Sequence, residues 1–381
     1  MTSRTPARRV AFATPDIDAE IEAVRGATIV MWRGEALPFD RVRDRIGQTD
    51  DRDARDRLYG SYAEALEALN PVLDRRLAAW RAEGDAADAA AADGHDPRLL
   101  DVELERFSQA VETPYYAALR RYLAQVDIEQ GDASEADIWY VTSGAAWSSW
   151  FGARDVERAT RAIGRGAAEP SGSDGWLAAE HELGGGPVQA GLAGPGIVAE
   201  AFRSVAGAPE WAGGELGMTA GEVPAYADFA AFVRLWRMRR DVALVTYELR
   251  LFSTDDVALQ RAYYSGIVGH ATGVAIAEAG YLEAVDRPFA SAERLRTAIM
   301  AGMLTDALER RLGTSWWRSD DAAAVVDAVG SATTEADALA ELGYDALDWR
   351  PVMRQIRTRL IGEMSGYGGP NITTRAGTRK V

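Results

Sequence analysis

The chain has 381 residues, of which 47% are hydrophobic and 26% are charged, and its formal net charge at pH 7 is −16. This length allows a large core in two or three lobes, and the acidic balance argues against a nucleic-acid binder, which would present a basic face. Because the sequence contains no cysteine, a disulfide framework, a thiolate nucleophile and a Cys-ligated metal are excluded.

The N-terminus carries arginines but no apolar stretch of the kind found in secretory signals. The sequence also lacks any run of about 18 apolar residues that would predict a membrane span. We therefore expect a soluble, cytoplasmic protein. Its expected partner is a small-molecule or peptide ligand, not nucleic acid or a membrane, and a homodimer is left open.

The N-terminal third is predicted to be largely helical after an irregular start over residues 1 to about 25. From Asp40 to Arg81 apolar residues recur at helical spacing, with an expected break at Asn70-Pro71, where the proline fits the first turn of a new helix. The Ala/Asp-rich residues 82–97 are predicted to form a linker, with His95 as a solvated loop residue.

Further helices are predicted on both sides of a loop-rich segment. A helical block over 98–165 carries many aromatic residues, which indicate core packing or, alternatively, a stacking wall for a ligand. Residues 166–222 are rich in Gly, Ala, Pro and Ser and are predicted to be loops around one or two short helices. C-terminal helices are predicted over 226–252, 255–279, 291–312, 320–329, 335–342 and 349–364. The predicted class is mainly α.

One segment contains half of a zinc-binding motif. In H-E-x-x-H two histidines on one helical face bind Zn²⁺ while the Glu acts as general base. His181 and Glu182 match the first half, but Gly185 stands where the second His would be. The glycines around Gly185 and the following Pro187 disfavour a continuous helix there. The motif is therefore degenerate.

Several other blocks are similar to one peptidase family. Residues 226–252 read YADFAAFVRLWRMRRDVALVTYELRLF, residues 262–274 read AYYSGIVGHATGV, and residues 311–356 include GTSWW and LGYDALDWRP. Together with 113–140, they resemble oligoendopeptidase F-like and thimet-type zinc metallopeptidases of the gluzincin clan. The resemblance covers about two thirds of the chain. It implies a mainly α, two-lobed, zincin-like helical fold around a deep cleft.

The resemblance also implies roles for individual segments and residues. It predicts an N-terminal helical lobe (1–165), a former metal-site region (166–225), a C-terminal helical lobe (226–365) and a tail (366–381). His181 matches the first zinc ligand, Glu182 the general base and Glu200 the third ligand. Where the family has tyrosines that hold the tetrahedral intermediate, this chain has Ala290 and Arg294.

Additional candidates for the cleft come from the C-terminal helices. Arg294 is expected either to clamp a carboxylate or phosphate or to take part in a surface Glu-Arg pairing with Glu293, Arg296 or a neighbouring helix. His270 is expected to be a hydrogen-bonded core residue or, alternatively, a general acid or base facing the cleft. Three tyrosines are candidate hydrogen-bond donors in the same cleft: Tyr263, Tyr264 and Tyr281.

We therefore expect a metallopeptidase-like pseudoenzyme that has lost its zinc site. It would use the retained cleft, without a metal cofactor, to bind or transform a peptide-like or small polar metabolite, including as a biosynthetic enzyme. One alternative is an active zinc-dependent oligopeptidase in which His270, Glu215 or Glu222 completes the metal site. A second is a non-catalytic helical interaction protein. The Gly-rich tail is expected to order against the cleft or a partner subunit through Tyr367, Asn371 and Thr373.

Overall fold

The computed structural model describes residues 14–92, 96–142, 193–254, 256–257 and 259–360. Within these residues the protein is mainly α-helical, as predicted, with one two-stranded sheet. The N-terminal elements are α1 (Pro15–Ala27), β1 (Ile29–Trp32), β2 (Glu35–Pro38), α2 (Phe39–Gly47), α3 (Arg52–Glu83), α4 (Ala86–Ala92), η1 (Pro97–Leu99), α5 (Leu100–Ala124), η2 (Gln130–Asp132) and α6 (Glu135–Val141).

The elements after residue 192 are also helical. They are α10 (Ala193–Ala206), α11 (Pro209–Gly214), α12 (Val223–Ser253), α13 (Gln260–Thr272), η3 (Glu278–Gly280), α14 (Ala290–Leu312), η4 (Trp316–Arg318), α15 (Asp320–Gly330), α16 (Glu335–Leu342) and α17 (Arg350–Arg359). The predicted helices over 226–252, 291–312, 320–329 and 335–342 are confirmed within a few residues at their ends.

The prediction of an irregular start is wrong from Pro15 onward, where α1 begins. Pro15 occupies the first turn, in which its missing N–H costs nothing, and Asp16 and Asp18 complement the helix dipole there. Ile21 is only 2% exposed and anchors the helix in the core next to α3. The helix was not predicted because its 13 residues contain few apolar side chains, so the pattern of an amphipathic helix is weak.

The expected break at Asn70-Pro71 is also wrong, because α3 continues through Pro71 for 32 residues. An internal proline costs about 3 kcal/mol. Leu69, Val72 and Leu73 are buried around it, and each buried aliphatic side chain contributes roughly 1.5–3 kcal/mol. The Asn70 amide donates to the Ala279 carbonyl oxygen at 3.2 Å, which ties α3 to η3. Tertiary burial outweighs the local helix-breaking preference.

Two other predicted boundaries differ from the structure. The predicted linker over 82–97 contains α4, and the predicted helix over 255–279 is reduced to α13. The latter ends because Gly273 adopts φ 71°, the left-handed conformation that stops helices. An added Cβ there would lie 2.6 Å from the Tyr116 ring, so only glycine fits.

The hairpin β1–β2 is absent from the predicted elements. Its strands pair antiparallel, with Trp32 opposite Glu35. Arg33 and Gly34 between them have φ values of 50° and 85°, which is the geometry of a tight two-residue hairpin turn. Strands of four residues are too short to produce a reliable alternating pattern.

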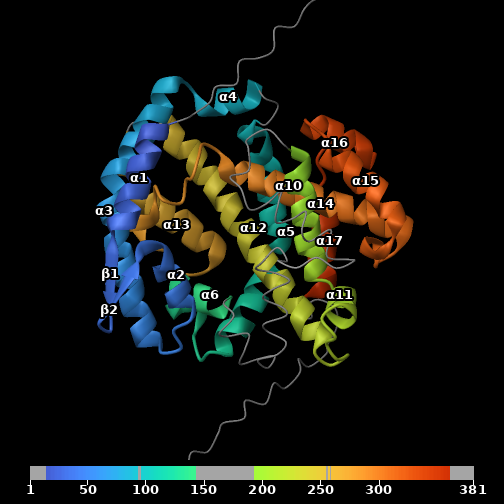
Figure 1. Ribbon diagram of the computed structural model, residues 1–381, viewed down its shortest axis with the longest axis horizontal. Coiled ribbons are helices and arrows are strands. Elements are labelled where there is room, and N and C mark those ends of the chain that lie inside the picture. The colour runs from blue at the N-terminus through green and yellow to red at the C-terminus, as the bar shows by residue number, and fades with distance from the viewer. Residues whose placement is uncertain (1–13, 93–95, 143–192, 255, 258, 361–381) are drawn as a thin grey trace, which may run out of the picture.

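Two hydrophobic cores lie on either side of α12, which runs diagonally across the molecule (Figure 1). The first core combines α5, α10, the N-terminal half of α12 and α14 to α17. It includes the α5 aromatic residues Phe107, Tyr115 and Tyr122, so their predicted packing role is confirmed. The second core combines α1 to α3, the C-terminal half of α12 and α13. Each core therefore joins segments that are far apart in the sequence.

Candidate functional site

One side of α12 carries a row of charged residues at helical spacing. We call this set the α12 charged face, and it consists of Arg234, Arg237, Arg240, Asp241 and Glu248. Intervals of three, four and seven residues bring side chains to the same side of a helix. Around this stripe the helix is buried by the two cores. Charges in such a position need either partners within the protein or access to solvent and ligand.

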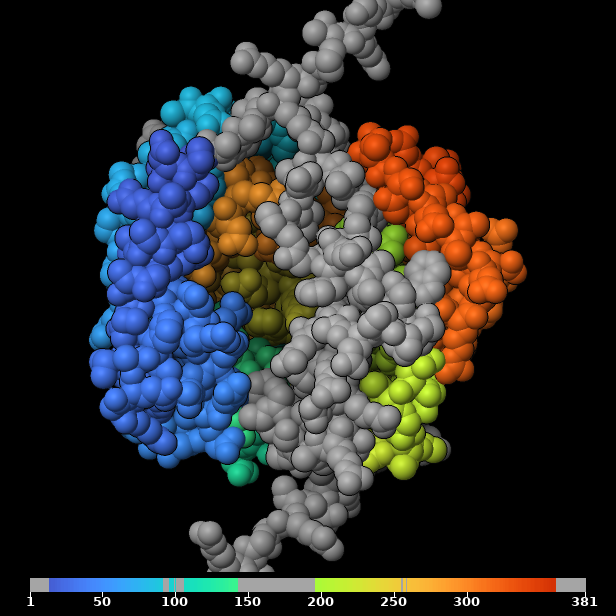
Figure 2. Space-filling view, in the orientation of Figure 1, coloured from blue at the N-terminus to red at the C-terminus, as the bar shows by residue number. Residues whose placement is uncertain are grey.

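The molecular surface is hollowed next to α12. Figure 2 shows a hollow beside the N-terminal elements, with atoms of α12 at a deeper level than these elements. The Arg237 guanidinium on α12 feels the charges of Glu200 and Arg203 on α10 and, more weakly, those of Asp241 and Arg43. The side chain reaches solvent, yet the surrounding protein desolvates it and lowers its pKa. Arg237 is therefore an exposed side chain of α12 whose charge the surrounding protein still affects.

Arg237 lacks a direct counter-ion. Within the described part of the chain, no hydrogen bond or ion pair involves its guanidinium, and the nearest charges act only through longer-range electrostatics. A guanidinium has five N–H donors. This side chain is therefore available to bind an anion.

Two neighbouring arginines also have neutral partners. Arg234 donates to the Ser204 hydroxyl at 2.7 Å and to the Gln355 amide oxygen at 3.3 Å, and burial lowers its pKa to about 10. Arg359 donates to the Ser204 carbonyl oxygen at 2.9 Å, and burial lowers its pKa as well. With Arg237, these residues form a cationic region inside an acidic protein.

Arg294, a residue predicted from the sequence, is joined to the α12 charged face. Its Nε donates to Asp241 Oδ1 at 2.9 Å, whereas Glu293 pairs with Arg287. The expected pairing of Arg294 is therefore confirmed for a neighbouring helix, and Glu293 is not its partner. Burial raises the pKa of Asp241, and the adjacent Arg294 acts in the opposite direction.

Glu248 fixes the start of α14 against α12. Its carboxylate accepts hydrogen bonds from the Ser291 hydroxyl and the Phe289 backbone N–H. Phe289 has φ 58°, a left-handed conformation that is uncommon for a residue of its size. Both Glu248 and Ser291 are fully buried, and burial raises the pKa of Glu248 to about 8. Glu248 is thus a structural anchor of the charged face and does not reach the hollow.

A second polar group surrounds Arg240. Glu135 of α6 lies with Oε1 4.0 Å from Arg240 Nε, and its Oε2 accepts a hydrogen bond from the Tyr59 hydroxyl at 3.1 Å. Tyr264 of α13 also hydrogen-bonds Arg240. Burial raises the pKa of Tyr264, so its hydroxyl remains protonated at neutral pH. The structure thus brings Tyr264 and Arg294 to the same face of α12.

The other two predicted tyrosines have different surroundings. The Arg250 guanidinium lies 4.0 Å from the ring centroid of Tyr263. The Tyr281 hydroxyl donates to Asp74 Oδ1 at 3.3 Å, and its ring lies 4.8 Å from the Arg261 guanidinium. In the described residues neither tyrosine contacts the α12 charged face.

The His270 side chain is exposed near the end of α13, so the interpretation as a core histidine is wrong. Its backbone carbonyl oxygen accepts a hydrogen bond from the Tyr116 hydroxyl at 2.5 Å. His270 follows the apolar residues Ile267 and Val268, but it lies on a different side of α13 from the buried Val268. The sequence pattern alone did not distinguish the two sides of such a short helix.

The residues considered as zinc ligands lie in several environments. His181, Glu182 and Gly185 lie outside the described residues, as do Tyr367, Asn371 and Thr373 of the tail. Glu200 of α10 pairs with Arg203. Glu215 accepts hydrogen bonds from Arg318 at 2.7 and 2.9 Å, and Glu222 accepts one from the Thr219 N–H at 2.8 Å. Among the described residues, no group of three or more His, Asp or Glu side chains could hold a metal ion.

Most of the α12 charged face was not identified from the sequence. The available signal was the spacing of Arg234, Arg237 and Asp241 within a long helix. That spacing is visible in the sequence, but the side to which it points is set by the packing of two separate cores.

Comparisons with family models, curated proteins and solved structures gave no match. In the described ranges, none of the helices combines the length and the apolar character needed to cross a bilayer.

Proposed function

We propose that the hollow over α12 is the ligand-binding cleft of a two-lobed, zincin-like scaffold that works without metal. Its ligand would be a peptide-like or small polar molecule that carries a carboxylate or phosphate group. The observation that carries this proposal is Arg237, an exposed guanidinium on α12 without a direct counter-ion in the described residues. The function of the scaffold would then be to recognise an anion at the floor of the cleft.

The energetics of arginine support an anionic ligand. Removing a cation from water is unfavourable unless a charge or hydrogen-bond acceptor compensates it. Arg234 and Arg359 add positive potential nearby, since their direct partners are neutral groups around Ser204. A bound carboxylate or phosphate would accept parallel hydrogen bonds from the Arg237 fork and neutralise this region.

The charges around Glu200 support function without zinc. This carboxylate pairs with Arg203 and also interacts electrostatically with Arg234 and Arg237. A dication would have to enter where positive charges already repel one another. In the sequence, Gly185 also replaces the second histidine of the zinc motif.

Chemical transformation of the ligand would require a proton donor or acceptor next to Arg237. Asp241 lies four residues further along α12 and has a raised pKa because it is buried. Tyr264 contributes a protonated hydroxyl beside Arg240. These two groups are the candidates for proton transfer, and binding remains the primary proposal.

Calorimetric titration with dipeptides, acyl amino acids and phosphorylated metabolites tests this proposal. The same ligands with the acidic group capped as an amide should bind at least tenfold more weakly. Arg237→Gln should weaken binding about 10- to 100-fold, because a hydrogen-bonded charge contributes roughly 1.5–3 kcal/mol. Arg250→Gln, on the same helix but over the Tyr263 ring, is the matched control and should bind normally.

Two outcomes would contradict the proposal. Equal binding to wild type and Arg237→Gln would show that the α12 charged face does not recognise the ligand. One equivalent of tightly bound zinc in the purified protein, lost in His181→Ala, would favour the zinc-dependent oligopeptidase instead.

A further inference from the structure

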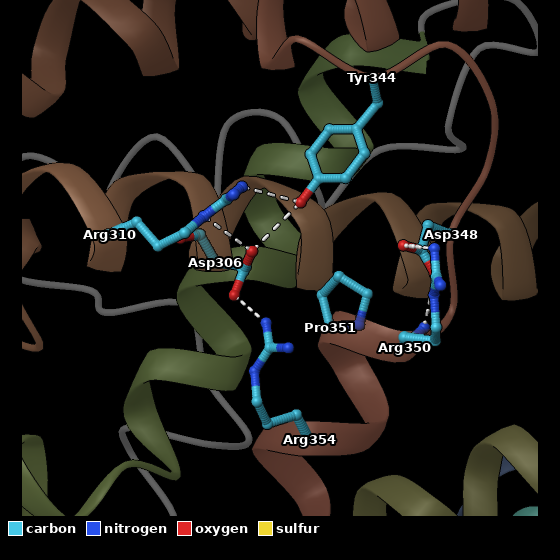
Figure 3. Close-up of a pocket in the computed structure, with 7 residues that line it drawn as sticks. All are labelled: Asp306, Arg310, Tyr344, Asp348, Arg350, Pro351 and Arg354. Atoms are coloured by element: carbon cyan, nitrogen blue, oxygen red, sulfur yellow. Dashed lines mark hydrogen bonds and ion pairs between the residues drawn. The ribbon is translucent and has the colours of Figure 1, made fainter.

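A second arginine cluster lines a pocket at the junction of α14, α17 and the segment between α16 and α17. The pocket has a volume of about 490 Å³ and is lined by Asp306 and Arg310 of α14, by Arg350 and Arg354 of α17, and by Tyr344 and Asp348 between the helices (Figure 3). Asp306 lies 12 residues beyond Arg294 on α14, roughly 18 Å along the helix axis. This pocket is therefore separate from the α12 charged face.

The close approach of α14 and α17 positions the cluster. Gly302 lies one turn before Asp306, and a Cβ added there would lie 2.6 Å from the Val352 Cβ. The glycine thus permits the backbones to pack tightly, and α17 places Arg354 opposite Asp306. Arg354 donates to Asp306 Oδ1 across this contact. The pocket is formed by two rigid helices, which favours a preorganised site.

A single buried carboxylate holds two arginines in this pocket. Asp306 is 7% exposed, and besides Arg354 it pairs with Arg310, whose Nε lies 3.1 Å from Oδ2. The Tyr344 hydroxyl donates to the same Oδ2 at 3.1 Å. Both oxygens of Asp306 are thus engaged by donors, so this carboxylate is poorly placed to bind a metal cation.

The lining carries a positive surplus. Arg350 and Asp348 neutralise each other through hydrogen bonds of 2.8 and 2.9 Å. Arg310 and Arg354 share the one negative charge of Asp306, which leaves one positive charge in a protein whose net charge is −16. Their side chains are 63% and 62% exposed, so a ligand has access to both.

The donor geometry favours an oxyanion with several oxygens. Arg354 uses one nitrogen, Nη2, on Asp306, and Arg310 uses Nε on Asp306 and Nη2 on the Tyr344 hydroxyl. Each guanidinium therefore keeps further N–H donors at a wall of the pocket. Donors from two helices can bind different oxygens of one phosphate, whereas a carboxylate has only two oxygens. The volume lies within the range of small-molecule sites.

We propose that this pocket binds a phosphate group through Arg310 and Arg354, with Arg350 at its rim. The phosphate is either the free inorganic ion or the terminal group of a small phosphorylated metabolite. The assignment rests on the two arginines, Arg310 and Arg354, that share the single carboxylate of Asp306. It does not depend on the function proposed for the α12 charged face.

Calorimetric titration of the full-length Arg237→Gln protein, in which the anion site proposed on α12 is removed, with inorganic phosphate, glycerol 3-phosphate and acetate at constant ionic strength tests the site. We expect phosphate to bind and acetate to bind at least tenfold more weakly. Tighter binding of glycerol 3-phosphate than of phosphate would identify a phosphorylated metabolite as the source, and the reverse order would identify the free ion.

Substitutions distinguish specific binding of phosphate in this pocket from general electrostatic attraction to the protein surface. Arg354→Gln should weaken phosphate binding at least tenfold, whereas Arg357→Gln, an exposed position on the same helix, should leave it within twofold. Arg310→Lys keeps the charge but loses the planar fork, so it should also weaken binding. Thermal melts establish that each variant is folded, and Arg237→Gln should bind phosphate here like wild type.

Equal weakening by Arg354→Gln and Arg357→Gln would overturn the proposal, because net charge alone would then explain the attraction. No binding of either phosphate compound at concentrations of about 10 mM would overturn it too, since even a dissociation constant of about 1 mM corresponds to only about 4 kcal/mol. Binding of acetate as tight as that of phosphate would overturn the assignment to phosphate.

Discussion

Arg55 of α3 and Arg237 of α12 are both arginines on long helices, but only Arg55 has a direct counter-ion among the described residues. Arg55 is 1% exposed, and its Nε and Nη2 donate to Asp137 Oδ1 at 3.2 and 2.7 Å. Its Nη1 donates to the Thr49 carbonyl oxygen at 2.8 Å. Arg237 has no such partner in the described residues. The Arg55–Asp137 ion pair joins α3 to α6 and has a structural role. The Arg237 guanidinium is available to a ligand.

Removing the Asp137 carboxylate from its pair with Arg55 should have the largest effect on stability. Asp137→Ala would leave the Arg55 cation buried without its counter-ion, which typically costs about 3–5 kcal/mol. We expect a loss of this size in the free energy of unfolding, measured by urea denaturation. Glu64→Gln, an exposed change on α3, serves as control and should shift stability by less than about 0.5 kcal/mol. A loss below 1 kcal/mol in Asp137→Ala would contradict a structural role for the pair.

Glu248 provides a pH-dependent test of burial beside the charged face. Its folded pKa is raised to about 8 by burial, above the ordinary value of 4.5. Below the ordinary value both folded and unfolded states are protonated, and stability carries no penalty. As pH rises from 4.5 to 8, the folded state binds the proton more tightly, so the free energy of unfolding falls, and above 8 the full penalty remains.

We therefore expect wild type to lose stability between pH 5 and 8, on the order of 2–4 kcal/mol, relative to Glu248→Gln, which cannot ionise. Urea denaturation of both proteins at several pH values measures the difference. Parallel stability profiles would show that burial does not perturb this carboxyl group.

Arg237→Met should change stability least of the three substitutions. Methionine keeps the aliphatic stem but removes the desolvated charge, so the free energy of unfolding should stay constant or increase by up to about 1 kcal/mol. Ligand binding should be lost at the same time. A destabilisation above 2 kcal/mol, measured by thermal and urea unfolding, would instead place Arg237 with Arg55 as a structural residue.

The sequence predicted the fold class better than it predicted the site. Helices α12, α14, α15 and α16 were recognisable because apolar residues at helical spacing are a local signal. The continuous course of α3 through Pro71 was not, because buried contacts on both sides of the proline override its local preference. The exposure of His270 was missed for a related reason, since a short apolar helix does not reveal which side faces the core.

The amino-acid sequence by itself determined that this protein is mainly helical, that cysteine chemistry is absent and that charges occur at helical intervals in α12. Only the tertiary structure decided which charges meet. Arg294 and Asp241 are 53 positions apart, and Arg354 and Asp306 are 48 apart. Helical periodicity acts over three or four residues, whereas such pairs depend on how separate helices pack. The same packing gives Arg55 its counter-ion and leaves Arg237 without one among the described residues.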